Sequence, residues 1–337
     1  MLGLLACEKK QSEIENKEKS SQAQQSESTT FKVGLVFDKA GADDKSFNES
    51  ASRGAKQAQE ELGIELKTIE PPDDSAYELS NERFASRGYD LVISVGFIQE
   101  EAVQKVAARH PETKFAIIDT TVNLPNVASL MFEEHQGSFL VGMIAAMKSK
   151  TATVGFVGGM DIPLIRRFAI AYEAGAKHAN PDVKVLTNYA GVTIEAFSDP
   201  TKGKELASSQ IAQGADVIFA AAGSTGLGVF DAVAEKNIFG IGVDSNQNWI
   251  KPGNILTSML KRVDVAVYET IKEAMNGNFE GGVKRFSLED KGIDYAIDQY
   301  NKDLINQETI DQLEKTKKQI ISGELKVPDY YVISKNS

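Results

Sequence analysis

The chain has 337 residues, of which 42% are hydrophobic and 25% are charged. These are ordinary globular proportions, with enough apolar surface for a core and enough length for two lobes. The formal net charge of -11 excludes general binding to nucleic acid, which needs clustered Lys and Arg side chains. The single cysteine excludes an internal disulfide, and His110, His135 and His178 lie too far apart in sequence to predict a metal site.

Residues 1–7 form a short apolar run that ends in Leu4-Leu5-Ala6-Cys7. This run resembles the lipobox of bacterial lipoproteins, whose cysteine carries the lipid anchor. The resemblance implies that residues 1–7 are the end of a truncated signal peptide. It also implies an extracytoplasmic protein held at the cell membrane through Cys7. Residues 8–30 are almost all Glu, Lys, Ser, Gln and Thr, which predicts a disordered tether because so little apolar surface can be buried.

From residue 31 onward, short β-branched runs alternate with helical patterns, which predicts parallel βαβ units. The first series has expected strands at 31–37, 64–69, 91–95, 114–118 and 128–131. Its expected helices lie at 46–62, 77–86 and 100–109. The first lobe is therefore expected to be a five-stranded α/β unit.

A helix at 136–148 opens a second series of the same kind. Its expected strands lie at 153–157, 184–189, 217–221, 238–243 and 255–258, with helices at 164–179, 202–213 and 228–236. Ligands of open parallel sheets bind beyond the carboxyl ends of the strands. Several residues follow expected strands in this way and point to one shared cleft: Asp38, Phe97, Asp119, Gly158, Gly223 and Asp244.

Five segments carry a resemblance to a known family. They are 43–50 (DDKSFNES), 155–159 (GFVGG), 172–176 (YEAGA), 220–226 (AAAGSTG) and 240–244 (GIGVD). Together with the lipobox they resemble the basic membrane protein (BMP) family of purine-nucleoside-binding lipoproteins. The resemblance implies an α/β, type I periplasmic-binding fold, in which two Rossmann-like lobes with parallel sheets are joined by a three-strand hinge. It also implies delivery of a purine nucleoside to the permease and ATPase subunits of an ABC importer.

The expected lobe boundaries follow from this fold. Lobe I is expected to comprise residues 31–132 and about 254–285, and lobe II residues 133–253 and about 286–337. We expect a monomer that is not an enzyme, without a cofactor or a bound metal.

Two phenylalanines are candidates for stacking on a nucleobase. Phe47 is flanked by Asp43 to Ser46 and by Asn48, and Phe197 by Glu195, Ser198 and Asp199, so neither lies on an apolar stripe that would bury it. The resemblance places both around the base. Stacking contributes ~1–3 kcal/mol per base.

Two carboxylates are candidates for the polar groups of the ligand. Asp119 ends an apolar strand, and the resemblance places it at the base edge. An ionised carboxylate only accepts hydrogen bonds, so it favours a base with an N1–H donor, such as guanine or hypoxanthine. Asp244 is suited to accept hydrogen bonds from both ribose hydroxyls. Further contact positions are carried over from the family: Asp38, Asn48, Gly223, beside the ribose, and Lys261.

Three other functions fit parts of the sequence. The loop at residues 223–228 suggests a dinucleotide-using dehydrogenase, but its spacing is G-x-x-G-x-G rather than G-x-G-x-x-G. Asp38, Asp43 and Asp44 could form the calcium cluster of a nucleoside hydrolase. A sugar or autoinducer binder of the same fold would keep Asp244 and the aromatic residues but would have little need for Asp119.

Overall fold

The computed structural model describes residues 30–335. Cys7 and all but the last residue of the expected tether lie outside the described residues, so their roles stay predictions. The chain divides into two units, Met1–Phe31 and Lys32–Ser337, and the description below concerns the second. Within the described part, no helix is both long and apolar enough to cross a membrane.

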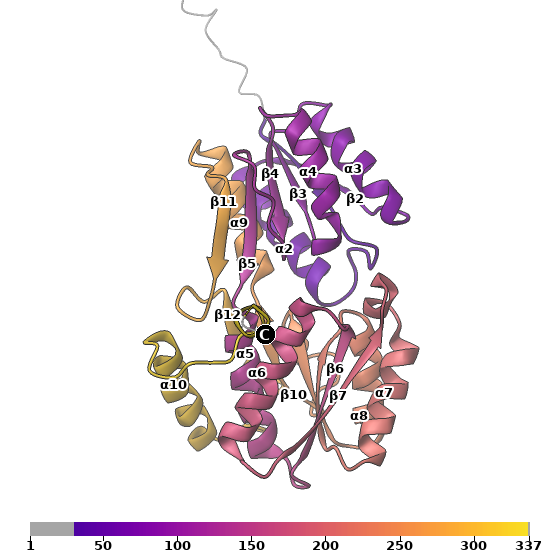
Figure 1. Cartoon of the computed structure of the whole chain (residues 1–337), viewed down its shortest axis with the longest axis vertical. Coiled ribbons are helices and arrows are strands. Elements are labelled where there is room, and N and C mark those ends of the chain that lie inside the picture. The colour runs from indigo at the N-terminus through magenta and orange to yellow at the C-terminus, as the bar shows by residue number, and fades with distance from the viewer. Residues whose placement is uncertain (1–29, 336–337) are drawn as a thin grey trace, which may run out of the picture. The chain divides into compact units, whose positions relative to one another are not determined.

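The first lobe is built on a six-stranded sheet with the order β11-β5-β4-β3-β1-β2, in which every pair is parallel (Figure 1). Strands β3, β4 and β5 read as almost continuous apolar runs, as expected for a parallel sheet covered by helices. The strands are β1 (Lys32–Val36), β2 (Glu65–Ile69), β3 (Leu91–Ser94), β4 (Lys114–Ile118), β5 (Val127–Phe132) and β11 (Gly282–Phe286). The helices are α2 (Phe47–Leu62), α3 (Tyr77–Ala85), α4 (Glu100–Arg109) and α9 (Val263–Met275), with short 3-10 turns η1 (Asp74–Ala76) and η2 (Phe97–Gln99).

The second lobe repeats this plan with the strand order β12-β10-β9-β8-β6-β7, and only β12 is antiparallel to its neighbour. The strands are β6 (Thr153–Met160), β7 (Lys184–Gly191), β8 (Val217–Ala221), β9 (Phe239–Asp244), β10 (Ile255–Lys261) and β12 (Ile293–Tyr295). The helices are α5 (Glu134–Lys148), α6 (Pro163–Ala179), α7 (Pro200–Ala212), α8 (Thr225–Glu235), α10 (Gln307–Ile321) and α11 (Tyr330–Ile333), with the 3-10 turn η3 (Ile194–Phe197).

Helices α5 and α6 pack backbone against backbone in the core of the second lobe. A Cβ atom at Gly142 would overlap the carbonyl oxygen of Tyr172, and one at Gly175 would overlap that of Phe139. Only glycine permits an approach this close. The segment 172–176, one of those that carry the family resemblance, is therefore a helix-packing segment.

The two lobes are joined by three crossovers, as the sequence predicts. The chain passes from the first lobe to the second between β5 and α5, returns between β10 and α9, and passes again between β11 and β12 (Figure 1). The crossovers are bonded to each other. The Glu133 N–H donates to the Phe286 carbonyl at 2.8 Å, and the Arg262 N–H donates to the Gly292 carbonyl at 2.8 Å.

The structure corrects one of the expected lobe boundaries. Strand β10 pairs in parallel with β9, so Ile255–Lys261 belongs to the second lobe, whereas the sequence analysis assigned residues from about 254 to the first. The chain returns to the first lobe only after Lys261. The sequence pattern did not reveal this because β10 is buried almost throughout, like the central strands of either lobe.

Candidate ligand-binding site

A pocket of about 590 Å³, including space open to solvent, lies between the lobes at the carboxyl ends of the strands. Its mainly apolar lining, with a few carboxylates and one lysine, suits a small organic molecule. The first lobe contributes Asp38, Ala40, Asp44, Phe47, Gly96, Phe97 and Asp119. The second lobe contributes Leu164, Ile165, Phe168, Ile194, Phe197, Ala221, Ala222, Gly223, Val243, Asp244 and Lys261.

Every ligand-contact residue expected from the sequence lines this pocket except Asn48. Asn48 is buried behind the lining, where its Nδ2 donates to Asp38 Oδ1 at 2.7 Å and to Asp44 Oδ2 at 3.2 Å. Burial raises the pKa of Asp38 to about 6, against the hydrogen bond from Asn48. Asn48 therefore holds two pocket carboxylates in place in the structure.

Asp44 organises the loop that carries Phe47, a role that the sequence analysis missed. Its carboxylate accepts from the backbone N–H groups of Ser46, Asn48 and Glu49 at 2.8, 2.9 and 3.0 Å, which satisfies the free donors at the start of α2. Burial raises its pKa above the ordinary value. An acid three residues before the start of a helix is the sequence signal that could have identified this role.

The calcium cluster considered for a hydrolase does not form. Asp44 is engaged with the backbone, whereas Asp43 is exposed and pairs with Lys45. Within residues 30–335, the group of potential metal ligands that does come together is Glu133, His135 and Asp329. The guanidinium of Arg167 already pairs with both of those carboxylates.

The aromatic residues of the pocket come from both lobes. Phe47 begins α2 in the first lobe, and Phe197 ends η3 in the second. A Cβ atom at Gly159 would overlap the ring of Phe197, so this glycine of segment 155–159 makes room for that ring. Phe168 on α6 also lines the pocket and was not singled out in the sequence.

Asp119 has an unpaired oxygen in the pocket. Its Oδ2 accepts from Lys261 Nζ at 2.6 Å, whereas its Oδ1 is buried and has no hydrogen-bond partner among the described residues. Burial raises the pKa of Asp119 to about 6, against the charge of Lys261. A buried acceptor without a donor costs about 1–3 kcal/mol. Oδ1 is therefore the natural position for a donor supplied by a ligand.

Asp244 lies where the two lobes touch. Its Oδ2 accepts from Ser46 Oγ of the first lobe at 2.6 Å, and burial raises its pKa to about 7. Ser245 Oγ donates to the Ser46 carbonyl at 2.8 Å, and Lys39 pairs with Glu195 across the cleft. These contacts show the lobes closed on each other beside the pocket.

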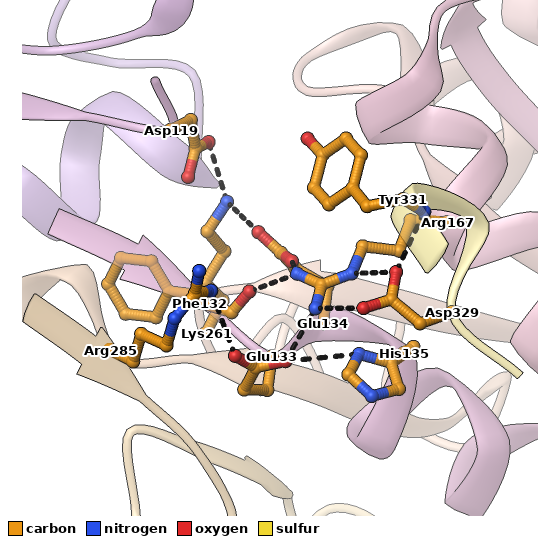
Figure 2. Close-up of polar contacts among 10 residues, drawn as sticks. All are labelled: Asp119, Phe132, Glu133, Glu134, His135, Arg167, Lys261, Arg285, Asp329 and Tyr331. Atoms are coloured by element: carbon orange, nitrogen blue, oxygen red, sulfur yellow. Dashed lines mark hydrogen bonds and ion pairs between the residues drawn. The ribbon is translucent and has the colours of Figure 1, made fainter. Parts of the chain in front are cut away.

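Lys261 is a buried cation that lines the pocket, and Figure 2 shows its ammonium group reaching Asp119 and Glu134. Burial opposes its charge, but Asp119, Glu134 and Asp244 outweigh burial and raise its pKa. Its ammonium lies 5.1 Å from the ring centres of both Phe47 and Phe132, so it also makes cation–π contacts. Glu134, an ion-pair partner of Lys261 at 3.1 Å, was not singled out in the sequence, although it begins α5 soon after β5 ends.

Two α/β lobes that are joined by three crossovers and closed beside a shared pocket define a bilobal solute-binding protein. Comparison with known proteins gives the family. Residues 31–330 match the family Bmp, described as "ABC transporter substrate-binding protein PnrA-like", and the chain belongs to this family. The proteins of this family are the substrate-binding components of ABC transporters.

Three similar proteins illustrate the family. An uncharacterized lipoprotein of Pyrococcus abyssi is 37% identical over 80% of this chain and 70% of its own. The ABC transporter nucleoside-binding protein BmpA of Lactococcus lactis is 32% identical over 89% of this chain and 90% of its own. The crystal structure of an ABC transporter solute-binding protein from Aeropyrum pernix K1 has a TM-score of 0.83 and 34% identity, covering 90% of this chain and 96% of that one.

Proposed function

We propose that the protein binds a purine nucleoside in the pocket between its lobes and delivers it to an ABC importer. It acts as a monomer on the outer face of the cell membrane, held there by lipid on Cys7, and it is not an enzyme. The name of the Lactococcus lactis relative supports the nucleoside, and the name of the Pyrococcus abyssi relative supports the lipid anchor.

The unpaired Oδ1 of Asp119 is the observation that carries this proposal. A base with an N1–H group supplies the donor that this oxygen lacks, and Phe47 and Phe197 offer an aromatic surface from each lobe. Asp244 accepts from the ribose hydroxyls, and Gly223 lets the backbone approach the sugar. Each part of a nucleoside then has a chemically matched partner.

Asp119 Oδ1 also discriminates between a nucleoside and a sugar that carries no base. A pentose would engage Asp244 and pack against the aromatic rings, but it carries no N–H group for Asp119 Oδ1. A pentose whose hydroxyl groups are engaged by Asp244 leaves that acceptor buried and unsatisfied, at a cost of about 1–3 kcal/mol, whereas a nucleoside supplies donors to both carboxylates. This difference in binding free energy favours a ligand that carries a base.

Two measurements test the proposed function. Mass spectrometry of small molecules released on denaturing the purified protein is expected to find a purine nucleoside. Calorimetric titration of ligand-free protein is expected to show binding of inosine, guanosine and adenosine, with ribose and the free bases much weaker. Recovery of a pentose, or binding of ribose as tight as that of the nucleosides, would refute the proposal in favour of a sugar binder.

A further inference from the structure

Lys261 and Glu134 both lie at crossovers between the lobes. Lys261 ends β10 just before the chain returns to the first lobe, and Glu134 begins α5 just after the chain enters the second. Glu134 does not line the pocket, yet its Oε1 lies 3.1 Å from Lys261 Nζ, whose other carboxylate partner is Asp119 at 2.6 Å. The Lys261 ammonium group therefore pairs with two buried carboxylates, those of Asp119 and Glu134.

Glu134 is in turn held from the opposite side by Arg167. Arg167 Nη1 donates to Glu134 Oε2 at 2.6 Å, and Arg167 Nε donates to Asp329 Oδ1 at 2.8 Å (Figure 2). The ring of Tyr331 lies 5.0 Å from the guanidinium carbon. A continuous chain of contacts thus runs from the C-terminal segment through Arg167, Glu134 and Lys261 to Asp119.

We propose that Glu134 is a positioning residue that sets selectivity among ligand bases. Because Glu134 and Asp119 share the positive charge of Lys261, Glu134 determines how readily the Asp119 carboxyl changes from hydrogen-bond acceptor to donor. This inference rests on the proposed function. As a carboxylate, Asp119 accepts from the N1–H of inosine or guanosine. As a carboxylic acid, it donates to N1 of adenosine, which is an acceptor.

The charges around the pair favour Glu134 as the group that stays ionised. Burial opposes its charge, but Lys261 and Arg167 outweigh burial and lower the pKa of Glu134. Burial raises the pKa of Asp119, and the negative charge of Glu134 adds to that rise. The charged and titratable groups that act on these two carboxyls are Lys261, Arg167, Asp38, Asp244, His135 and Tyr331.

The test compares three variants of the full-length protein. Glu134→Gln keeps the shape of the side chain and removes its charge. Asp329→Asn is expected to have a smaller effect. Arg167 then has one carboxylate partner fewer and binds Glu134 more strongly, so Glu134 binds Lys261 less strongly. Asp161→Asn is the matched control, since Asp161 pairs with Arg166, the neighbour of Arg167, and has no contact with this chain of residues.

Two readouts are needed. The first is the carboxyl ¹³C titration of Asp119 in ligand-free protein, assigned with Asp119→Asn. The second is the ratio of inosine to adenosine affinity as a function of pH. Glu134→Gln is expected to move the Asp119 midpoint down from about 6 by roughly one pH unit. At the wild-type midpoint, the affinity ratio then rises about tenfold. Asp329→Asn shifts both in the same direction by less, and Asp161→Asn leaves both unchanged.

Thermal unfolding shows which variants are folded. If folded Glu134→Gln keeps the wild-type midpoint and ratio, or weakens both nucleosides equally at every pH, Glu134 has only a structural role and the inference is wrong. If Glu134→Gln does not fold, the same criteria apply to Asp329→Asn. Failure of the wild-type protein to bind any nucleoside contradicts the proposed function and with it the selectivity, while the carboxyl titration still decides whether Glu134 controls Asp119.

Discussion

At the scale of single residues, the two pocket carboxylates that end strands share an unusual backbone. Asp119 has φ 71° and Asp244 has φ 62°, in the left-handed region that aspartate and asparagine tolerate better than other non-glycine residues. The sequence could predict both as candidates because each follows an apolar strand. It could not predict the free oxygen of Asp119, because the partner of the other oxygen, Lys261, lies 142 residues away.

Asp119→Asn is expected to weaken inosine and guanosine by about 10- to 150-fold, which corresponds to loss of a charged hydrogen bond of about 1.5–3 kcal/mol. Adenosine is expected to lose much less, because the new amide donates to its N1. Asparagine also tolerates the left-handed backbone, so the fold should survive. Calorimetric titration checks this, and an equal loss for all three nucleosides would show that Asp119 does not contact the base edge.

The affinity for inosine is expected to fall as the pH is lowered through about 6, the raised pKa of Asp119. Protonation turns the acceptor for N1–H into a donor, so the loss occurs on the acid side. Asp244 and Asp38 titrate in the same range, but they act on all nucleosides alike. The ratio of inosine to adenosine affinity therefore isolates Asp119, and a ratio that is constant between pH 5 and pH 8 would contradict this assignment.

At the scale of elements, the sequence predicted the strands and α-helices from β1 to β10 and missed those that follow. The expected bounds of β4, β8 and α4 agree with the structure residue for residue, because apolar runs and helical periodicity mark them clearly. Helix α9, the edge strands β11 and β12, and helix α10 were not predicted. β11 is mostly exposed and β12 has three residues, so neither shows a strand pattern, and α10 follows a long irregular stretch.

The turn η3 is the element that brings an aromatic ring of the second lobe to the pocket. Phe197→Ala is expected to weaken inosine, guanosine and adenosine by similar factors of about 5 to 150, because stacking contributes ~1–3 kcal/mol whatever the base. Val192→Ala, in the exposed stretch before η3, serves as the control and should bind like wild type. A strongly base-dependent loss in Phe197→Ala, measured by calorimetry, would argue against stacking.

At the scale of the whole molecule, a ligand that touches both lobes binds the folded chain and not the unfolded one. The free energy of unfolding should then rise by about 2.7 kcal/mol at a nucleoside concentration one hundred times the Kd. The midpoint of thermal unfolding is expected to rise steadily with inosine concentration. Ribose at the same concentrations is the control, and an equal rise with ribose would indicate that the base is not recognised.

Membrane attachment is predicted to depend on Cys7, which lies outside the described residues. Expressed behind a lipoprotein signal sequence, the protein is expected to incorporate labelled palmitate and to partition into detergent, since stable anchoring takes more than one acyl chain. Cys7→Ser should abolish both properties without affecting nucleoside binding. A Cys7→Ser protein that still partitions into detergent would show that another segment holds it at the membrane.

The closed contacts beside the pocket also have a kinetic consequence. Ser46 bonds to Asp244, and Lys39 pairs with Glu195, so the lobes must separate before an enclosed molecule can leave. The time before release then depends on how often these shared contacts break, as well as on the ligand's own contacts with both lobes. A membrane partner that separates the lobes would break both sets of contacts at once and so release the ligand.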